Sequence, residues 1–283
     1  MLKLEGKIRK LANDLIAQFI DNKQREFTEV FGRPLPVMVF LDIMGLPQAM
    51  RDTFVAWAMA LLHSTDRTIM AETMGKITAY LKSAIVKKKA QPDDGVVSLI
   101  AHAAPGGVPL SDKEVFGFVC FLLIGGLDTV FATINNIWLS LAQNPAKVRE
   151  RIADPDNIST QPEKRLRVGS VTFSGRVLIQ DVELRGVQLK KDDRVTCVLP
   201  ACNFNPDVFP NPREVNFHRP KKTTLAFIGN VHSCMGAHLA GLEMKIALQG
   251  WLRRIPEFAV QPGAKIEYRP GGVVGPEAVP LVW

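Results

Sequence analysis

Cysteine is scarce in this chain. Its 283 residues include four cysteines, and none of them shows the C-x-x-C spacing of a metal knuckle or a redox pair. The four are Cys120, Cys197, Cys202 and Cys234. The printed residues contain no secretory signal before them, so we expect a reducing, cytoplasmic environment without disulfides.

Acidic residues are also in the minority. There are 28 Asp and Glu against 35 Lys and Arg, which gives a formal net charge of +7. The basic residues are spread along the chain rather than gathered in one arm, so we expect an acidic protein partner and no nucleic acid. With 47% apolar residues, the chain can bury a sizeable core in one large or two smaller domains.

Charge is nearly absent from residues 115–146, where Asp128 is the single charged residue before Lys147. Ser111 and Glu114 form a capping-box pattern, so we expect one long helix over residues 112–143. By length it could cross a membrane, but an acid at mid-span would cost about 3 kcal/mol. The alternative is a central helix buried by protein, which the amphipathic helices around it favour. We therefore expect no membrane span.

The rest of the chain divides into a helical part and a small β region. The remaining helices are expected at 4–19, 48–63, 69–89, 96–102 and 234–254. The strands are expected at 176–180, 182–185, 187–189 and 194–199. A proline-rich stretch over 203–220 predicts an irregular meander, and 262–283 predicts a C-terminal hairpin. The fold class is therefore mainly α with a small β region.

Cys234 lies between a turn-forming loop and the predicted start of the last helix. Cys234 follows that loop and precedes the last helical pattern, where exposed N–H groups and the positive end of the helix dipole favour a thiolate. Gly229 and Gly236 let the backbone approach a flat ligand closely. The alternative is that Cys234 is a small buried apolar residue, the commoner fate of a free cysteine.

A second pattern lies inside the long predicted helix. Gly125 and Gly126 cost about 1 kcal/mol each relative to alanine, and they clear a patch where a ligand could lie against the backbone. Asp128 and Thr129 follow them at once. The alternative is a local kink, with Thr129 bonded to a carbonyl one turn earlier and Asp128 paired with a distant lysine or arginine. These residues alone leave both interpretations open.

The cysteine loop resembles the heme-binding loop of the cytochromes P-450. The residues in register are Phe227, His232, Cys234, Gly236, Leu239 and Ala240. The stretch from Gly125 to Thr129 resembles the oxygen-binding helix of the same family. The resemblance implies that the Cys234 thiolate binds the iron of heme b.

The same resemblance assigns roles to further residues. It implies that Arg176 and His232 bind the heme propionates, that Thr129 holds oxygen or a water, and that Asp128 feeds protons. It implies a heme-thiolate monooxygenase, an oxidoreductase that inserts one atom of dioxygen into a small apolar, terpenoid-like substrate. A ferredoxin-type donor would supply electrons. Candidates for its docking face are Lys221, Lys222, Arg253 and Arg254.

The resemblance extends over residues 1–283 as a single partial domain. Residues 1–155 form its helical portion, and 156–283 hold the β region, meander, cysteine loop, last helix and C-terminal strands. The likeness is greatest to the bacterial camphor 5-monooxygenase type, and the family's N-terminal strands and substrate-covering loop are expected to be missing.

The sequence also departs from the family pattern. Asn230 replaces a loop glycine, and Lys164 stands where the family's Glu-x-x-Arg signature has glutamate if Arg167 is its arginine. These departures favour an alternative, a catalytically impaired or non-catalytic heme-binding remnant.

Overall fold

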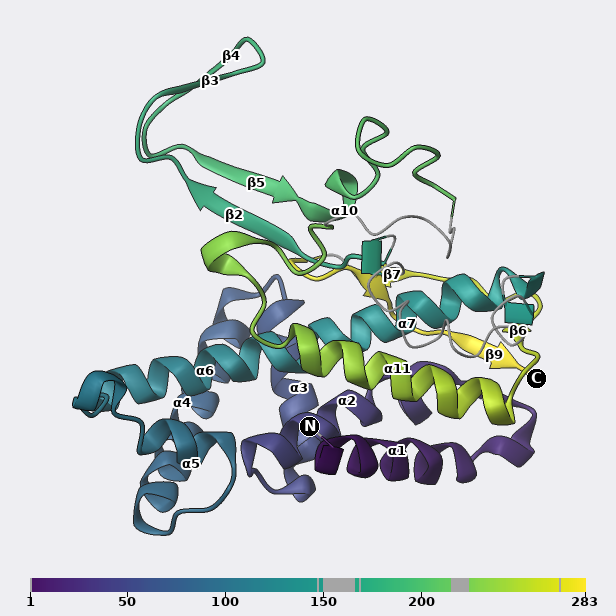
Figure 1. Ribbon diagram of the computed structural model, residues 1–283, viewed down its shortest axis with the longest axis horizontal. Helices are drawn as coiled ribbons and strands as arrows, with labels where there is room; N and C mark the ends of the chain where they lie inside the picture. Colours follow the sequence, from purple (N-terminus) through teal and green to yellow (C-terminus); the bar gives the residue numbers. More distant parts are fainter. Residues whose placement is uncertain (1, 147, 150–165, 168, 215–223, 270) are drawn as a thin grey trace.

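Helices make up most of the molecule (Figure 1). The computed structural model describes residues 2–146, 148–149, 166–167, 169–214, 224–269 and 271–283. Its α-helices are α1 Leu2–Ala17, α2 Pro34–Met44, α3 Arg51–Leu62, α4 Arg67–Ala90, α5 Val96–Ala101, α6 Asp112–Leu127, α7 Thr129–Ala142, α10 Leu199–Cys202 and α11 Ala237–Arg254. Shorter helical turns are η1 Ile20–Asn22, η2 Thr28–Gly32, η3 Gln48–Met50, η4 Pro105–Gly107 and η6 Asn230–His232.

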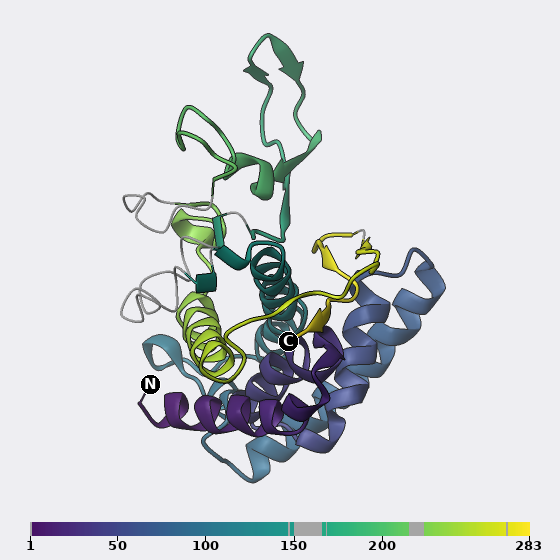
Figure 2. The same cartoon turned by 90° about the vertical axis from the view of Figure 1, so that its right-hand side faces the viewer.

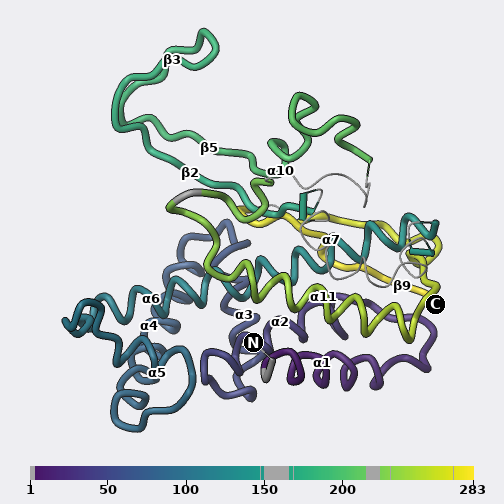
Figure 3. Tube along the Cα trace, in the orientation of Figure 1, coloured from purple at the N-terminus to yellow at the C-terminus, as the bar shows by residue number. Residues whose placement is uncertain are grey.

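The strands are short and form four small antiparallel sheets. They are β1 Gln24–Glu26, β2 Phe173–Val177, β3 Val182–Leu184, β4 Val187–Leu189, β5 Arg194–Val198, β6 Ala259–Val260, β7 Tyr268–Arg269, β8 Gly275–Pro276 and β9 Pro280–Val282. In the sheet β1-β9-β6, the strand β1, which follows α1, pairs with the last strand, β9. Strand β7 pairs with β8 in the expected C-terminal hairpin. The pairs β2-β5 and β3-β4 form an arm that extends away from the helices (Figure 3).

The helix expected over 112–143 is present but is interrupted at Asp128, where the alternative of a local kink places the break. The segment forms α6 and α7, which meet at Asp128. Thr129 Oγ1 donates a hydrogen bond to Gly125 O at 2.8 Å, and a side chain that bonds into the backbone ladder next to a glycine pair weakens the helix there. The predicted capping box is confirmed, since Ser111 Oγ accepts from Glu114 N at 3.3 Å.

In the described part of the chain, the helices pack around two large cores, and a third cluster holds only Ala132, Val171 and Val273. The first core lies among α1, η2, α7 and α11, where the Trp138 ring lies 5.0 Å from Phe27 and 5.9 Å from Trp251. The second core lies among α2, α3, α4, α5 and α6, with Phe54 fully buried in it. Figure 2 shows α11 and the α6–α7 pair lying next to each other. Thus α6 is anchored mainly in the second core and α7 in the first.

The apolar stretch formed by α6 and α7 has the length of a membrane-spanning helix. Residues Asp112–Ala142 could cross a bilayer by length and composition, and 44% of their most apolar window is buried inside the protein. Most residues of α7 are buried, including Trp138 with no exposed surface. This packing agrees with the expected central buried helix.

Candidate functional site

Cys234 lies in a closed loop just before α11. The helix begins at Ala237, three residues later than expected, with Gly236 as its N-cap. The loop closes because Cys234 N donates to Phe227 O at 3.0 Å, with the turn η6 in between. The Cys234 side chain is exposed, so the alternative of a small buried residue is wrong. Figures 1 and 2 both place this loop between the helices and the β2-β5 arm.

The cysteine loop contains an unusual backbone conformation. Ile228 has φ of 55°, in the left-handed region that a β-branched residue rarely adopts. Its N–H donates to Leu225 O at 3.1 Å, so the tight turn holds it there. The unusual backbone conformation of this loop is therefore at Ile228, directly after Phe227, and the family pattern gives no sign of it.

A buried polar network ties the cysteine loop to the β region. Asn203 is 1% exposed; its Oδ1 accepts from Leu225 N at 2.8 Å and its Nδ2 donates to Ser170 Oγ at 2.6 Å. Arg167 Nη1 donates to Asn203 O at 2.7 Å and its guanidinium lies 5.1 Å from the Phe209 ring. Arg167 therefore fixes the meander that leads into the cysteine loop.

The two adjacent glycines face different surroundings. A Cβ on Gly126 would lie 2.4 Å from a ring carbon of Phe40, whereas a Cβ on Gly125 would meet nothing within 4 Å. Phe118 and Phe121 share the face of α6 on which Gly125 lies, and both are exposed. Gly126 is therefore required for helix packing, and Gly125 leaves backbone open beside an exposed aromatic surface.

Asp128 is fully buried and has a histidine partner. Its Oδ2 lies 2.9 Å from His63 Nε2, so its hydrogen-bond partner is a histidine and not the lysine or arginine of the kink alternative. Burial raises the pKa of Asp128 above its usual range, while His63, Arg269 and Arg33 act in the opposite direction. Thr129 makes the bond to Gly125 O that the kink alternative requires.

The remaining predicted site residues, those for the heme propionates and for the electron donor, do not form one cluster. Arg176 is exposed on β2 and donates to Ser174 Oγ at 2.6 Å and to Gly175 O at 2.8 Å, and His232 is exposed in η6. Arg254 donates to Asn13 O at 3.1 Å. Positions 164, 219, 221 and 222 lie outside the described residues.

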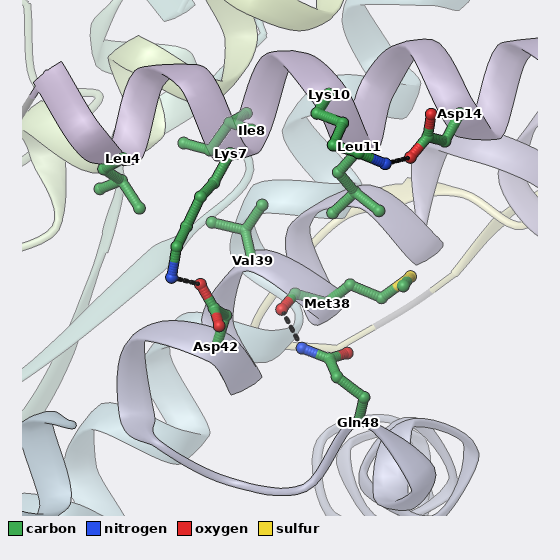
Figure 4. A pocket seen from close by; sticks show the side chains of 10 residues that line it. All are labelled: Leu4, Lys7, Ile8, Lys10, Leu11, Asp14, Met38, Val39, Asp42 and Gln48. Carbon is green, nitrogen blue, oxygen red and sulfur yellow. Dashed lines mark hydrogen bonds and ion pairs between the residues drawn. The ribbon is translucent and has the colours of Figure 1, made fainter. Parts of the chain in front are cut away.

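The described residues also form a groove of about 300 Å³ between α1 and α2 (Figure 4). Ile8 and Val39 are part of its apolar lining, and Lys7 Nζ at its rim lies 3.0 Å from Asp42 Oδ2. None of the predicted site residues lines this groove. It is therefore separate from the cysteine loop and from Asp128.

Comparisons with known proteins agree with this architecture. The family model for cytochrome P450 matches residues 165–276. "Probable cytochrome P450 127A1" from Sinorhizobium fredii is 30% identical over 284 residues, covering 100% of this chain and 68% of that protein. The chain belongs to the cytochrome P450 family. Polyketide biosynthesis cytochrome P450 PksS from Bacillus subtilis is 29% identical over 92% of this chain.

Solved structures give the same result. The crystal structure of CYP101J2 superposes with a TM-score of 0.89 at 29% identity, covering 99% of this chain and 70% of that one. The chain spans 65% of the length of PksS, so it matches a little less than two thirds of that relative.

Members of this family bind heme b, and the residues here fit such a group. The Cys234 thiol is exposed, Cβ atoms on Gly125 and Gly229 would meet nothing within 4 Å, and Phe121 offers an exposed aromatic surface. Among the described residues, no group of three His, Cys, Asp or Glu side chains could hold a metal ion.

Proposed function

We propose that the chain provides the heme-thiolate site of a monooxygenase that inserts one atom of dioxygen into a small apolar substrate. The observation that carries the proposal is the exposed Cys234 thiol in the loop before α11, a helix that lies beside α7. Gly125, Asp128 and Thr129 lie where α6 ends and α7 begins. When bound, heme b would supply an iron that activates dioxygen, and Cys234 is the residue that would hold this iron.

The protein's own groups have distinct roles in this proposal. Cys234 Sγ ligates the iron, and the open backbone at Gly125 admits a flat ligand beside α6. Asp128 holds the proton that the reaction consumes, and Thr129 positions oxygen or a water after releasing Gly125 O. Arg176 and His232 bind the propionates, because arginine and carboxylate form charge-assisted hydrogen bonds.

The substrate and the partner follow from the exposed surfaces. Phe118 and Phe121 provide an apolar wall, which suits a compact terpenoid-like molecule of the kind taken by the camphor 5-monooxygenase type. Among the relatives, PksS is named for polyketide biosynthesis and not for a terpenoid. A net charge of +7 and the exposed Arg253 suit an acidic ferredoxin-type donor in the cytoplasm.

A second candidate function is a heme-binding remnant without turnover. The strained backbone at Ile228 favours it, because strain in the cysteine loop weakens the geometry that holds a heme ligand. Lys164 in place of the expected glutamate favours it as well. In this case heme binding persists while oxygen insertion is lost.

A carbon monoxide difference spectrum of the reduced protein tests both proposals. We expect the Soret band of thiolate-ligated heme in the wild type and its loss in Cys234→Ser. Absence of heme uptake would refute both proposals. A thiolate spectrum without transfer of ¹⁸O from labelled dioxygen to camphor or other compact terpenoids, with a surrogate ferredoxin and reductase, would favour the remnant.

A further inference from the structure

The groove between α1 and α2 has an apolar floor beside an open face of α1 (Figure 4). Ile8 and Val39 are buried at this floor, and Leu4 and Leu11 of α1 are half-buried next to them. Figure 1 shows α11 above α1 and no helix of the described chain below it. Partly exposed leucines seven residues apart on one helix are typical of a helix that packs against another helix. This face of α1 therefore has the pattern of a helix-docking surface.

The rim of the groove carries both signs of charge in equal number. Its charged side chains are Lys7, Lys10, Asp14 and Asp42. Lys7 Nζ lies 3.0 Å from Asp42 Oδ2. Lys10 Nζ lies 2.5 Å from Asp14 Oδ2. All four side chains are exposed, and exposed ion pairs are weak, so the lysines can change partners at little cost. A rim without net charge suits a partner surface that also carries both signs.

The exposed face of α1 is complementary to itself. Lys7 lies four residues before Leu11, and Asp14 lies three residues after it. Two copies of α1 that run antiparallel, with a two-fold axis near Leu11, bring Lys7 of each protomer to the level of Asp14 of the other. The two leucines then meet near the axis, and two identical ion pairs flank them. Each Lys7 lies between Asp42 of its own chain and Asp14 of the other.

We propose that the groove between α1 and α2 docks α1 of a second copy of this chain, which gives a two-fold symmetric dimer. Leu4 and Leu11 supply the apolar contact, and the pairs of Lys7 with Asp14 set the antiparallel orientation. The groove is small, about 300 Å³. Stable interfaces bury about 1,600 Å², so this dimer is weak and forms at concentrations on the order of micromolar or above. It does not depend on heme, because the groove is separate from the cysteine loop.

Sedimentation velocity of the wild type over about 1–500 μM tests this dimer. We expect a sedimentation coefficient that rises with concentration from the monomer value towards the dimer value. Lys7→Glu turns both ion pairs between the protomers into repulsions, and so does Asp14→Lys. Each variant should therefore raise the dissociation constant about tenfold or more.

An equimolar mixture of Lys7→Glu and Asp14→Lys is the decisive sample. In the mixed dimer, the introduced acid of one chain faces the introduced lysine of the other, and the two unchanged residues face each other as well. Both pairs are attractive again, so the mixture should dimerise although neither variant does so alone. Misfolding of either variant would not produce this recovery.

Lys190→Glu is the matched control. The Lys190 side chain is 68% exposed against 67% for Lys7, and its Nζ lies 2.9 Å from Asp181 Oδ2 in the β arm. This variant changes the net charge of the chain as Lys7→Glu does, at a place outside the groove. It should dimerise like the wild type, and an equal loss of dimer would show that net charge and not the groove controls association.

Methyl NMR spectra at rising protein concentration locate the contact. The resonances of Leu11 and Val39 should shift, whereas Ile179, which is 86% exposed on the arm, should not. Shifts at Ile179 in place of Leu11 would assign self-association to the arm and overturn the inference. A wild type that stays monomeric at every concentration would overturn it too, as would a mixture that remains as monomeric as the two variants alone.

Discussion

Gly125→Ala and Gly126→Ala add the same methyl group to adjacent residues, and the structure predicts that their effects differ. The methyl of Gly126→Ala would lie 2.4 Å and 2.6 Å from two ring carbons of Phe40. Phe40 is 8% exposed and belongs to the second core, so its ring has little free space. The methyl of Gly125→Ala would meet nothing within 4 Å.

The magnitude follows from two opposing effects. Alanine gains up to about 1 kcal/mol over glycine in a helix, and this gain is similar at both positions. Adding a methyl to a packed core costs about 1–3 kcal/mol, and that cost applies to Gly126→Ala alone. The free energies of unfolding should therefore differ by about 1–3 kcal/mol, with Gly125→Ala the more stable variant.

Urea unfolding of both variants measures this difference, provided that the slope of free energy against urea is unchanged. Gly125→Ala should also weaken heme or ligand binding, because its methyl occupies the open patch on α6, while the protein stays folded. Equal unfolding free energies would refute the reasoning. They would show that the Phe40 ring moves aside at little cost and that Gly126 has no packing role.

Two further predictions concern the cysteine loop and the last helix. Ile228→Gly should raise the free energy of unfolding by about 1 kcal/mol, because it removes a left-handed β-branched residue at φ 55°; a less stable variant in urea would contradict this. Burial raises the pKa of Glu243 well above its usual range, so the folded state binds a proton that the unfolded state releases. Stability should fall as pH rises from the unfolded pKa of about 4.3 towards the folded one. Glu243→Gln should flatten this dependence in urea titrations between about pH 5 and pH 8, and an unchanged slope would exclude Glu243 as its source.

The sequence allowed the local parts of the site to be predicted. The cysteine loop and the pair Asp128-Thr129 each depend on residues within one or two turns, and the capping box at Ser111 is equally local. The family and the mainly α fold followed from these patterns. The break between α6 and α7 was one of two interpretations of Gly125-Gly126, and the sequence could not decide between them because the apolar composition continues across the break.

The partners of these residues required the fold. His63 and Asp128 are 65 residues apart, and Asn203 and Leu225 are 22 apart. No periodicity links such pairs, because their separation is set by how whole helices pack. A lone histidine at the end of a predicted helix is usually a surface residue, and its sequence neighbours give no sign of a buried acid opposite.

The position of Asp128 between the two cores explains why its neighbours come from distant segments. The helix before it packs in the second core, as does α3, which ends at His63. The helix after it packs in the first core, where η2 places Phe31 two residues before Arg33. Each core thus supplies one element that holds a basic side chain near the acid. A shift of the cores relative to each other would change the His63–Asp128 distance before it disturbed either interior, since close-packed interiors resist deformation more than the contacts between them.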